Sequence, residues 1–310
     1  MASHEQHGAG TPRGTALRYV ALAGTWGSSF LLIKVALRGL APVQVVFARV
    51  VVGAAVLALM MTLGRRRWPR EPRLWLHLAV LGLLYCAVPF TLFAYAGETL
   101  PSGLSAILNA TVPLMTVLAT AVVVPAEKLG VRKALGVLVG GAGVAIVVGI
   151  WRLATPDVAA SLPSILACLG ATACYGTGFA YMRRFVIGRH PYDAVTIAAG
   201  QVLTAAVVMC VALPFFGGPA PALDPVVVAG VALLGAFGTG LAYAWNTRIV
   251  VAWGPVAAST VTYLTPLVGV ALGIAVLGER LSWNEPVGGV VVLLGVLITQ
   301  GSVRLGRRRP

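Results

Sequence analysis

The sequence predicts an all-α polytopic membrane protein with ten transmembrane helices, arranged as two inverted five-helix repeats with the N and C termini cytoplasmic. Three observations predict this fold class: an apolar composition, ten long apolar runs, and basic residues gathered on one side of those runs. Of the 310 residues, 58% are hydrophobic and 10% are charged, whereas soluble domains carry roughly 25% charged residues. This composition excludes a soluble enzyme, a disordered chain and a small secreted domain held by disulfides.

Each apolar run is about 20 residues long, which is the length a helix needs to cross a bilayer. Outer-membrane strands would be about ten residues long and alternate in polarity, so the runs favour helices. The runs cover residues 15–35, 43–63, 74–96, 102–124, 131–150, 162–182, 193–214, 226–248, 255–277 and 285–303. The first run is not a cleaved signal peptide, because Arg18 lies too close to the cleavage-like Ala21-Leu22-Ala23 to leave an apolar core.

The basic residues predict the orientation of these helices, since cytoplasmic loops are enriched in Lys and Arg. With the N-terminus in the cytoplasm, 18 of the 23 basic residues lie in cytoplasmic segments. The exceptions are Lys34, Arg38, Arg49, Arg152 and Arg280. The opposite orientation would reverse this bias. The net charge of +14 is therefore a signature of topology, and we expect no nucleic-acid partner.

Five pieces of the first half recur in the second half in the same order, which indicates an internal repeat. The matched pieces are 26–30 with 175–179, 94–99 with 242–247, Pro113 with Pro266, 127–129 with 279–281, and Gly136 and Gly143 with Gly288 and Gly295. Because each half holds five helices, an odd number, the second half must enter the membrane inverted. Inverted repeats are typical of secondary transporters.

Three of these features together resemble the drug/metabolite transporter superfamily, specifically its EamA-like transporters. They are Trp26-Gly27-Ser28-Ser29-Phe30, Arg49 after Pro42, and the run from Pro266 through Gly278-Glu279-Arg280-Leu281 to Gly288. The resemblance implies ten helices in two EamA-type repeats. It also implies export of small metabolites, amino acids or drugs, commonly driven by ion or proton gradients. The first copy of the acidic motif departs from the pattern and reads Ala126-Glu127-Lys128-Leu129, which suggests a feature of the helix end more than a substrate ligand.

Five segments follow from the repeat and the resemblance. They are a disordered cytoplasmic N-terminus at 1–14, a first EamA-like five-helix repeat at 15–150, an external linker at 151–160, a second EamA-like repeat at 161–303, and a basic cytoplasmic tail at 304–310.

Two prolines predict where a cavity lies. Pro113 and Pro266 fall near the middle of the fourth and ninth helices, and a mid-helix proline leaves the carbonyl four residues earlier without its partner. These are the carbonyls of Asn109 and Thr262. In lipid such a carbonyl must face protein, water or ligand, so breaks at matching positions indicate a central cavity. The alternative is a structural kink that neighbouring helices satisfy.

Arg49 is the clearest charge inside a predicted span, about 10 Å from the outer end of the second helix. A charge at this depth needs a partner or water. We consider two roles: pairing with a substrate carboxylate or gating on one hand, and holding backbone carbonyls on the other.

Glu98 is the candidate for proton coupling. It lies at the outer mouth near Lys34 and Arg38, which predicts an ion pair, and a carboxylate partly shielded from water can carry a proton. The alternative is an ordinary charge at a helix end.

Aromatic, hydroxyl and amide side chains near these positions complete the predicted cavity, although hydroxyls in membrane helices often serve only helix packing. These candidates are Trp26, Ser28, Ser29, Tyr95, Tyr175, Thr177, Gln201, Tyr243, Asn246 and Tyr263. The glycines of the fifth and tenth helices predict close helix packing, within the chain or in a dimer.

The prediction for function is a secondary active transporter in the plasma (inner) membrane, exporting small metabolites, amino acids or drug-like compounds by alternating access. Its cavity is lined mainly by helices 1, 3, 4, 6, 8 and 9. Export rests on the resemblance alone. We expect a small-molecule substrate, a proton as candidate coupling ion, contact with the lipid bilayer, and a monomer or homodimer. No catalytic residue, metal site or cofactor is predicted, because the four histidines lack metal-type spacing and there is no phosphate loop. The alternatives are an uncoupled facilitator or channel, and a non-transporting protein of lipid handling or signalling.

Overall fold

The structure, a computed structural model, describes residues 12–124, 129–152 and 155–301. Within these ranges the chain is all-helical and contains no strand. The predicted basic tail, most of the predicted N-terminal segment and the first copy of the acidic motif at 126–128 lie outside the described residues. Helix α8 begins at Pro156, inside the segment predicted as an external linker.

Nine stretches of the described residues are helical, long and apolar enough to cross a membrane. They are α1 (Pro12–Ala36); α2 (Pro42–Leu63); α3 (Pro72–Gly82), η1 (Leu83–Ala87) and α4 (Val88–Thr99) as one span; α5 (Ser102–Asn109) with α6 (Val112–Val123); α7 (Val131–Val148) with η2 (Ile150–Arg152); α8 (Pro156–Phe185); α9 (Ala194–Phe216); α10 (Pro225–Gly235), η3 (Ala236–Leu241) and most of α11 (Ala242–Ser259) as one span; and η4 (Thr260–Tyr263) with α12 (Thr265–Leu277).

The tenth predicted span forms an apolar helix of 17 residues, α13 (Asn284–Gln300), which is shorter than the other nine. The described residues therefore show a polytopic membrane protein, and the count of ten spans stays a prediction.

Local sequence accounts for many helix starts. Pro42, Pro72, Pro156 and Pro225 occupy the first turn of α2, α3, α8 and α10, where a missing N–H costs nothing. The Asp193 side chain caps α9 by accepting a 2.8 Å hydrogen bond from the Thr196 N–H.

Two long spans contain a π-helical turn instead of a continuous α-helix. η1 lies between α3 and α4, and η3 lies between α10 and α11. A π turn widens the helix and changes the direction of its carbonyls, and such turns are frequent at functional sites.

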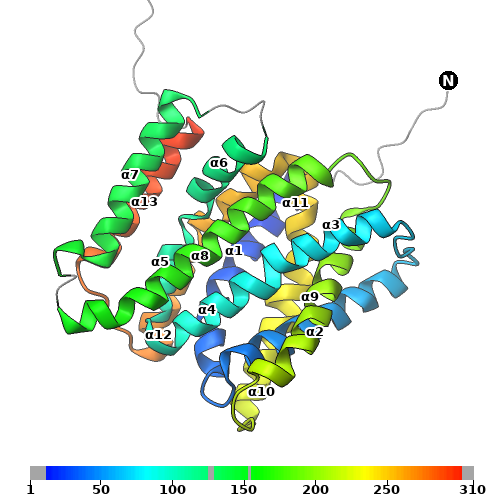
Figure 1. The fold of residues 1–310 in the computed structure, drawn as a ribbon, viewed down its shortest axis with the longest axis horizontal. Helices are drawn as coiled ribbons and strands as arrows, with labels where there is room; N and C mark the ends of the chain where they lie inside the picture. The colour runs from blue at the N-terminus through cyan, green and yellow to red at the C-terminus, as the bar shows by residue number, and fades with distance from the viewer. Residues whose placement is uncertain (1–11, 125–128, 153–154, 302–310) are drawn as a thin grey trace, which may run out of the picture.

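Glycines bring α7 and α13 together at one edge of the molecule (Figure 1). A Cβ added at Gly136 would lie 2.5 Å from the carbonyl oxygen of Gly295, and one added at Gly143 would lie 2.9 Å from that of Gly288. Residue numbers rise along one helix as they fall along the other, so the two helices are antiparallel. The close packing predicted from these glycines is thus present within one chain.

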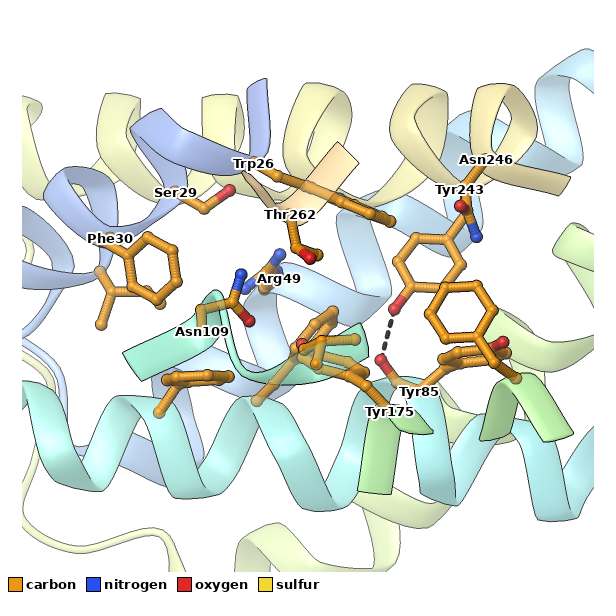
Figure 2. Close-up of a pocket in the computed structure, with 15 residues that line it drawn as sticks. Trp26, Ser29, Phe30, Arg49, Tyr85, Asn109, Tyr175, Tyr243, Asn246 and Thr262 are labelled. Atoms are coloured by element: carbon orange, nitrogen blue, oxygen red, sulfur yellow. Dashed lines mark hydrogen bonds between the residues drawn. The ribbon is translucent and has the colours of Figure 1, made fainter. Parts of the chain in front are cut away.

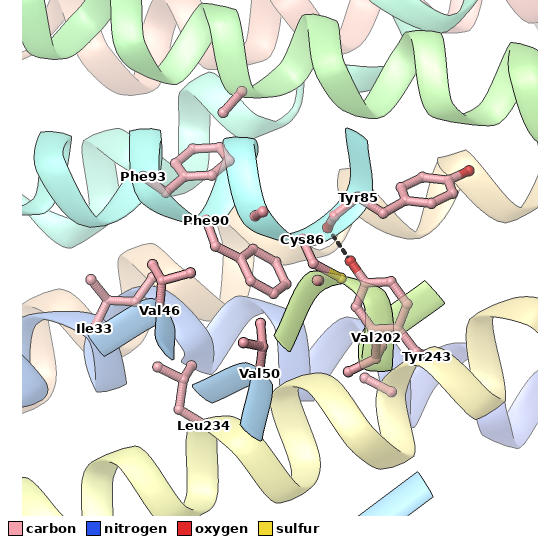
Figure 3. Close-up of a cluster of buried hydrophobic side chains, with 14 of the residues drawn as sticks. Ile33, Val46, Val50, Tyr85, Cys86, Phe90, Phe93, Val202, Leu234 and Tyr243 are labelled. Atoms are coloured by element: carbon pink, nitrogen blue, oxygen red, sulfur yellow. Dashed lines mark hydrogen bonds between the residues drawn. The ribbon is translucent and has the colours of Figure 1, made fainter. Parts of the chain in front are cut away.

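The core draws side chains from both halves of the sequence (Figure 3). Ile33 of α1, Val50 of α2 and Phe90 of α4 are buried beside Leu234 of α10 and Tyr243 of α11. This mixed core holds the helices around the cavity described next.

Candidate functional site

An aromatic cavity lies between the two halves of the chain (Figure 2). Its lining residues are Trp26, Ser29, Phe30, Ile33, Arg49, Tyr85, Phe90, Phe93, Asn109, Val112, Tyr175, Phe179, Tyr243, Asn246 and Thr262. The open space is about 50 Å³, which suits a few water molecules at the ~10–15 Å³ that one needs. A larger solute therefore requires the cavity to widen.

Eight of the predicted cavity residues lie in its wall: Trp26, Ser29, Arg49, Asn109, Tyr175, Tyr243, Asn246 and Thr262. Five others do not: Ser28, Tyr95, Thr177, Gln201 and Tyr263.

Helix geometry explains these five misplacements, because neighbouring residues on a helix point about 100° apart. Ser28 turns back to donate a 2.9 Å hydrogen bond to the Thr25 carbonyl, and Thr177 is half-buried on another face of α8. The Tyr95 side chain is 45% exposed, while Gln201 is fully buried elsewhere in α9. Tyr263 accepts a 2.6 Å hydrogen bond from the Gln300 amide of α13.

Seven wall residues lie outside the predicted set: Phe30, Ile33, Tyr85, Phe90, Phe93, Val112 and Phe179. All are apolar or aromatic, so nothing in the sequence separates them from ordinary packing residues. The nearest signal is Arg49, because a buried guanidinium attracts an aromatic face.

Arg49 is held by dipoles and an aromatic ring. Its side chain is 4% exposed. Nε donates a 2.8 Å hydrogen bond to the Thr239 hydroxyl, and Nη2 donates a 3.1 Å hydrogen bond to the Gly238 carbonyl. The guanidinium carbon lies 3.6 Å from the centre of the Phe90 ring.

No carboxylate balances this charge, since the cavity wall contains no Asp or Glu. Figure 2 shows the guanidinium turned into the middle of the cavity. A buried cation without a counter-ion favours the arrival of an anion.

The two π turns supply hydrogen-bond acceptors to the site. η3 contributes Gly238 and Thr239, the two acceptors that hold Arg49 of α2. η1 contributes the carbonyl of Tyr85, which accepts the hydroxyl of Tyr243 from α11. Each half of the chain thus fixes a cavity side chain of the other half through a π turn.

The proline breaks lie where the sequence predicts them. Pro113 and Pro266 occupy the second position of α6 and α12. The Asn109 amide donates a 3.3 Å hydrogen bond to the Thr265 hydroxyl, which donates a 2.9 Å hydrogen bond to the Thr262 carbonyl. The Thr262 carbonyl, predicted to lack a partner, is therefore satisfied by a side chain one turn along.

Two regions of the chain, residues 15–149 and 162–300, match the model of the EamA-like transporter family. The chain belongs to this family. Each matched region contributes residues to the cavity wall, so the two matched regions meet at the candidate site.

Relatives of this EamA-like transporter match nearly its whole length. It is 29% identical over 286 residues to the uncharacterized inner membrane transporter YedA of Escherichia coli K12, covering 89% of this chain and 87% of the relative. It is 24% identical to protein PecM of Dickeya dadantii, covering 92% and 91%. A solved crystal structure aligns with a TM-score of 0.65 at 20% identity, covering 94% of this chain and 98% of the other, which supports the fold.

Glu98 of this EamA-like transporter does not form the predicted ion pair with Lys34 or Arg38 among the described residues. Its side chain is exposed, so the partial shielding on which its predicted coupling role rests is absent. In the described part of the chain, no group of three His, Cys, Asp or Glu residues could hold a metal ion.

Proposed function

We propose that the chain is a secondary active transporter of the plasma membrane that exports small organic solutes by alternating access, with the aromatic cavity as the substrate site. Membership of the EamA-like family supports transport, and similarity to the inner membrane transporter YedA supports a location in the membrane. The observation that carries the proposal is Arg49, a buried cation that faces the cavity without a carboxylate partner. Such a residue inside a membrane protein is a functional-site candidate.

The substrate class follows from the lining chemistry. Eight of the fifteen wall residues are aromatic, which suits an apolar or aromatic body. Arg49 suits a carboxylate, and a cationic solute would meet like charge. Asn246 presents a buried Oδ1 without a partner in the described chain, which would accept an N–H from the substrate. We therefore favour small aromatic or apolar carboxylates that carry a hydrogen-bond donor.

The inverted repeat is part of this proposal. Antiparallel packing of α7 on α13 is what two five-helix repeats of opposite orientation require for their fifth helices. The enrichment of basic residues in alternate loops supports an orientation with the N and C termini in the cytoplasm. In this orientation α5 begins, and α12 ends, at the external side.

Transport into proteoliposomes tests the assignment of Arg49. We expect uptake of a labelled aromatic carboxylate to exceed that of its neutral amide, and Arg49→Gln to remove this preference. Lys34→Gln is the matched control, because Lys34 is a membrane-proximal cation outside the cavity wall. Equal uptake of the two solutes by the unaltered protein, or an unchanged preference in Arg49→Gln, would contradict the proposed substrate class.

The energy source needs a separate measurement. Accumulation against a gradient only when a pH gradient is imposed would support proton coupling, and accumulation independent of pH would exclude it. Equilibration without accumulation would identify an uncoupled facilitator. No movement of any tested solute would favour the non-transporting alternative.

A further inference from the structure

The two interrupted helices pack tightly at one end. α5 lies antiparallel to α12, because residue numbers rise along α5 as they fall along α12. The contacting pairs are Gly103 with Val270, Ala106 with Gly269, and Asn109 with Thr265. A Cβ added at Gly269 would lie 2.5 Å from the Ala106 Cβ, and one added at Gly103 would lie 3.4 Å from Val270. In the proposed orientation this contact lies on the external side of Asn109, the α5 residue in the cavity wall.

The cytoplasmic part of the fourth span, α6, borders a small cleft. The cleft lies among α6, α7, α13 and Ser259, the last residue of α11. Thr116, Thr120 and Lys133 are among its polar residues. The structure thus has direct contact between α5 and α12 at the external end and a cleft with polar residues at the cytoplasmic end.

One carboxylate fastens α5 to α12 at the external end. Glu279 follows α12, and its Oε1 accepts a 2.7 Å hydrogen bond from the Ser102 N–H. Oε2 accepts a 2.9 Å hydrogen bond from the Ser102 hydroxyl and a 3.0 Å hydrogen bond from the Gly103 N–H. The carboxylate therefore caps the N-terminus of α5 from 177 residues away, where negative charge is also favoured by the helix dipole.

The local sequence leaves α5 dependent on this distant cap. Helices are ordinarily capped by the side chain just before their first turn, but that position is Pro101, which makes no cap hydrogen bond. Two glycines allow the Glu279 carboxylate to reach α5 instead. Gly278 ends α12 with a left-handed φ of 65°, and a Cβ at Gly273 would lie 2.4 Å from Glu279 Oε2.

We infer that Glu279 is a latch that holds the external end of the cavity closed. This inference rests on the proposed function and its orientation. Opening the external end separates α5 from α12, which breaks three hydrogen bonds to a carboxylate and leaves the first N–H groups of α5 without partners. Removing the carboxylate therefore shifts the population toward a state open to the outside.

Thiol labelling in intact cells tests the latch without using any substrate. The reporter is Ser29→Cys in the cavity wall, in a background whose four cysteines are replaced by alanine, with a membrane-impermeant thiol reagent added outside. With Glu279 present we expect slow labelling. In Glu279→Ala we expect labelling at least about tenfold faster, since loss of a single charge-assisted hydrogen bond suffices for that ratio.

The matched control is Glu98→Gln, which alters an exposed acid at the same end of the bundle and should leave the labelling rate unchanged. Should Glu279→Ala fail to fold, Glu279→Gln and Ser102→Ala weaken the same contacts and should accelerate labelling less. Rapid labelling with Glu279 intact, or equal rates with and without the carboxylate, would overturn the latch. A labelling change without any effect of Arg49→Gln on transport would retain the latch and reject only the substrate assignment.

Discussion

Each of the two π turns, η1 and η3, interrupts a long α-helical span, yet the two turns bind different groups. η1 receives a neutral phenol, because the Tyr85 carbonyl accepts the Tyr243 hydroxyl. η3 receives a charge, because Gly238 and Thr239 accept the Arg49 guanidinium. Arg49, the charged residue of the cavity, thus belongs to the first half of the chain, and its two hydrogen-bond acceptors belong to the second half.

Local sequence explains the different roles. η3 is rich in glycine, so α2 approaches its backbone closely: a Cβ at Gly235, just before η3, would lie 2.5 Å from the Val52 Cβ. η1 carries bulky residues, and its Tyr85 ring forms part of the cavity wall. η3 therefore binds a side chain of α2, whereas η1 both binds the Tyr243 hydroxyl and lines the cavity.

We expect the greatest loss of stability from a substitution in η3. Thr239→Val keeps the shape of the side chain but leaves Arg49 Nε without its acceptor, and hydrogen bonds to charged groups contribute about 1.5–3 kcal/mol. We expect a loss of stability of this size in thermal unfolding of the purified protein, and weaker transport. Thr247→Val is the control, because the Thr247 hydroxyl is buried without a partner in the described chain. Equal losses in both variants would contradict the assigned role of η3.

A smaller effect is expected on the neutral side. Tyr243→Phe removes the hydroxyl donated to the Tyr85 carbonyl, and we expect a loss of about 1 kcal/mol. Tyr85→Phe is matched to it, because the Tyr85 hydroxyl is buried and lacks a partner in the described chain, so its removal should be neutral or stabilising. A larger loss for Tyr243→Phe than for Thr239→Val would reverse the comparison.

The sequence reveals the proline breaks but not the π turns. Pro113 and Pro266 each lack an N–H, so the interruption can be read from the residue type alone. A π turn requires no particular residue, and Leu83–Ala87 reads as an ordinary apolar helix. It becomes visible only when the packing of both halves is known.

The site residues likewise divide into those that residue type predicts and those that depend on packing. Arg49 is predictable, because a charge in an apolar run must have a partner. Gln201 and Thr177 are equally polar, yet they lie outside the cavity, and residue type does not specify which neighbour a helix face meets. Phe90 cannot be recognised from the sequence, because its contact with Arg49 joins two helices.

A hydrogen bond outside the π turns, between Tyr192 and Glu71, limits the pH range in which the stabilities of the two π-turn variants can be compared. Glu71 lies just before α3 and Tyr192 just before α9. The Tyr192 hydroxyl donates a 2.6 Å hydrogen bond to the Glu71 carboxylate, and this bond lowers the pKa of Glu71 below its usual value. Its contribution to stability is therefore present above the ordinary glutamate pKa of about 4.3 and is lost as pH falls through the lowered value.

We expect Tyr192→Phe to reduce the thermal midpoint slightly at neutral pH, by less than either π-turn variant, because both groups are exposed to solvent. The difference from the unaltered protein should be constant between about pH 6 and 8 and should shrink as the pH falls below the ordinary glutamate pKa of about 4.3, as the carboxylate takes up its proton. Unfolding curves recorded across this range check the sign. A difference that grows as the pH falls would mean that the bond stabilises the protonated carboxyl, and the π-turn comparison would then need to be confined to neutral pH.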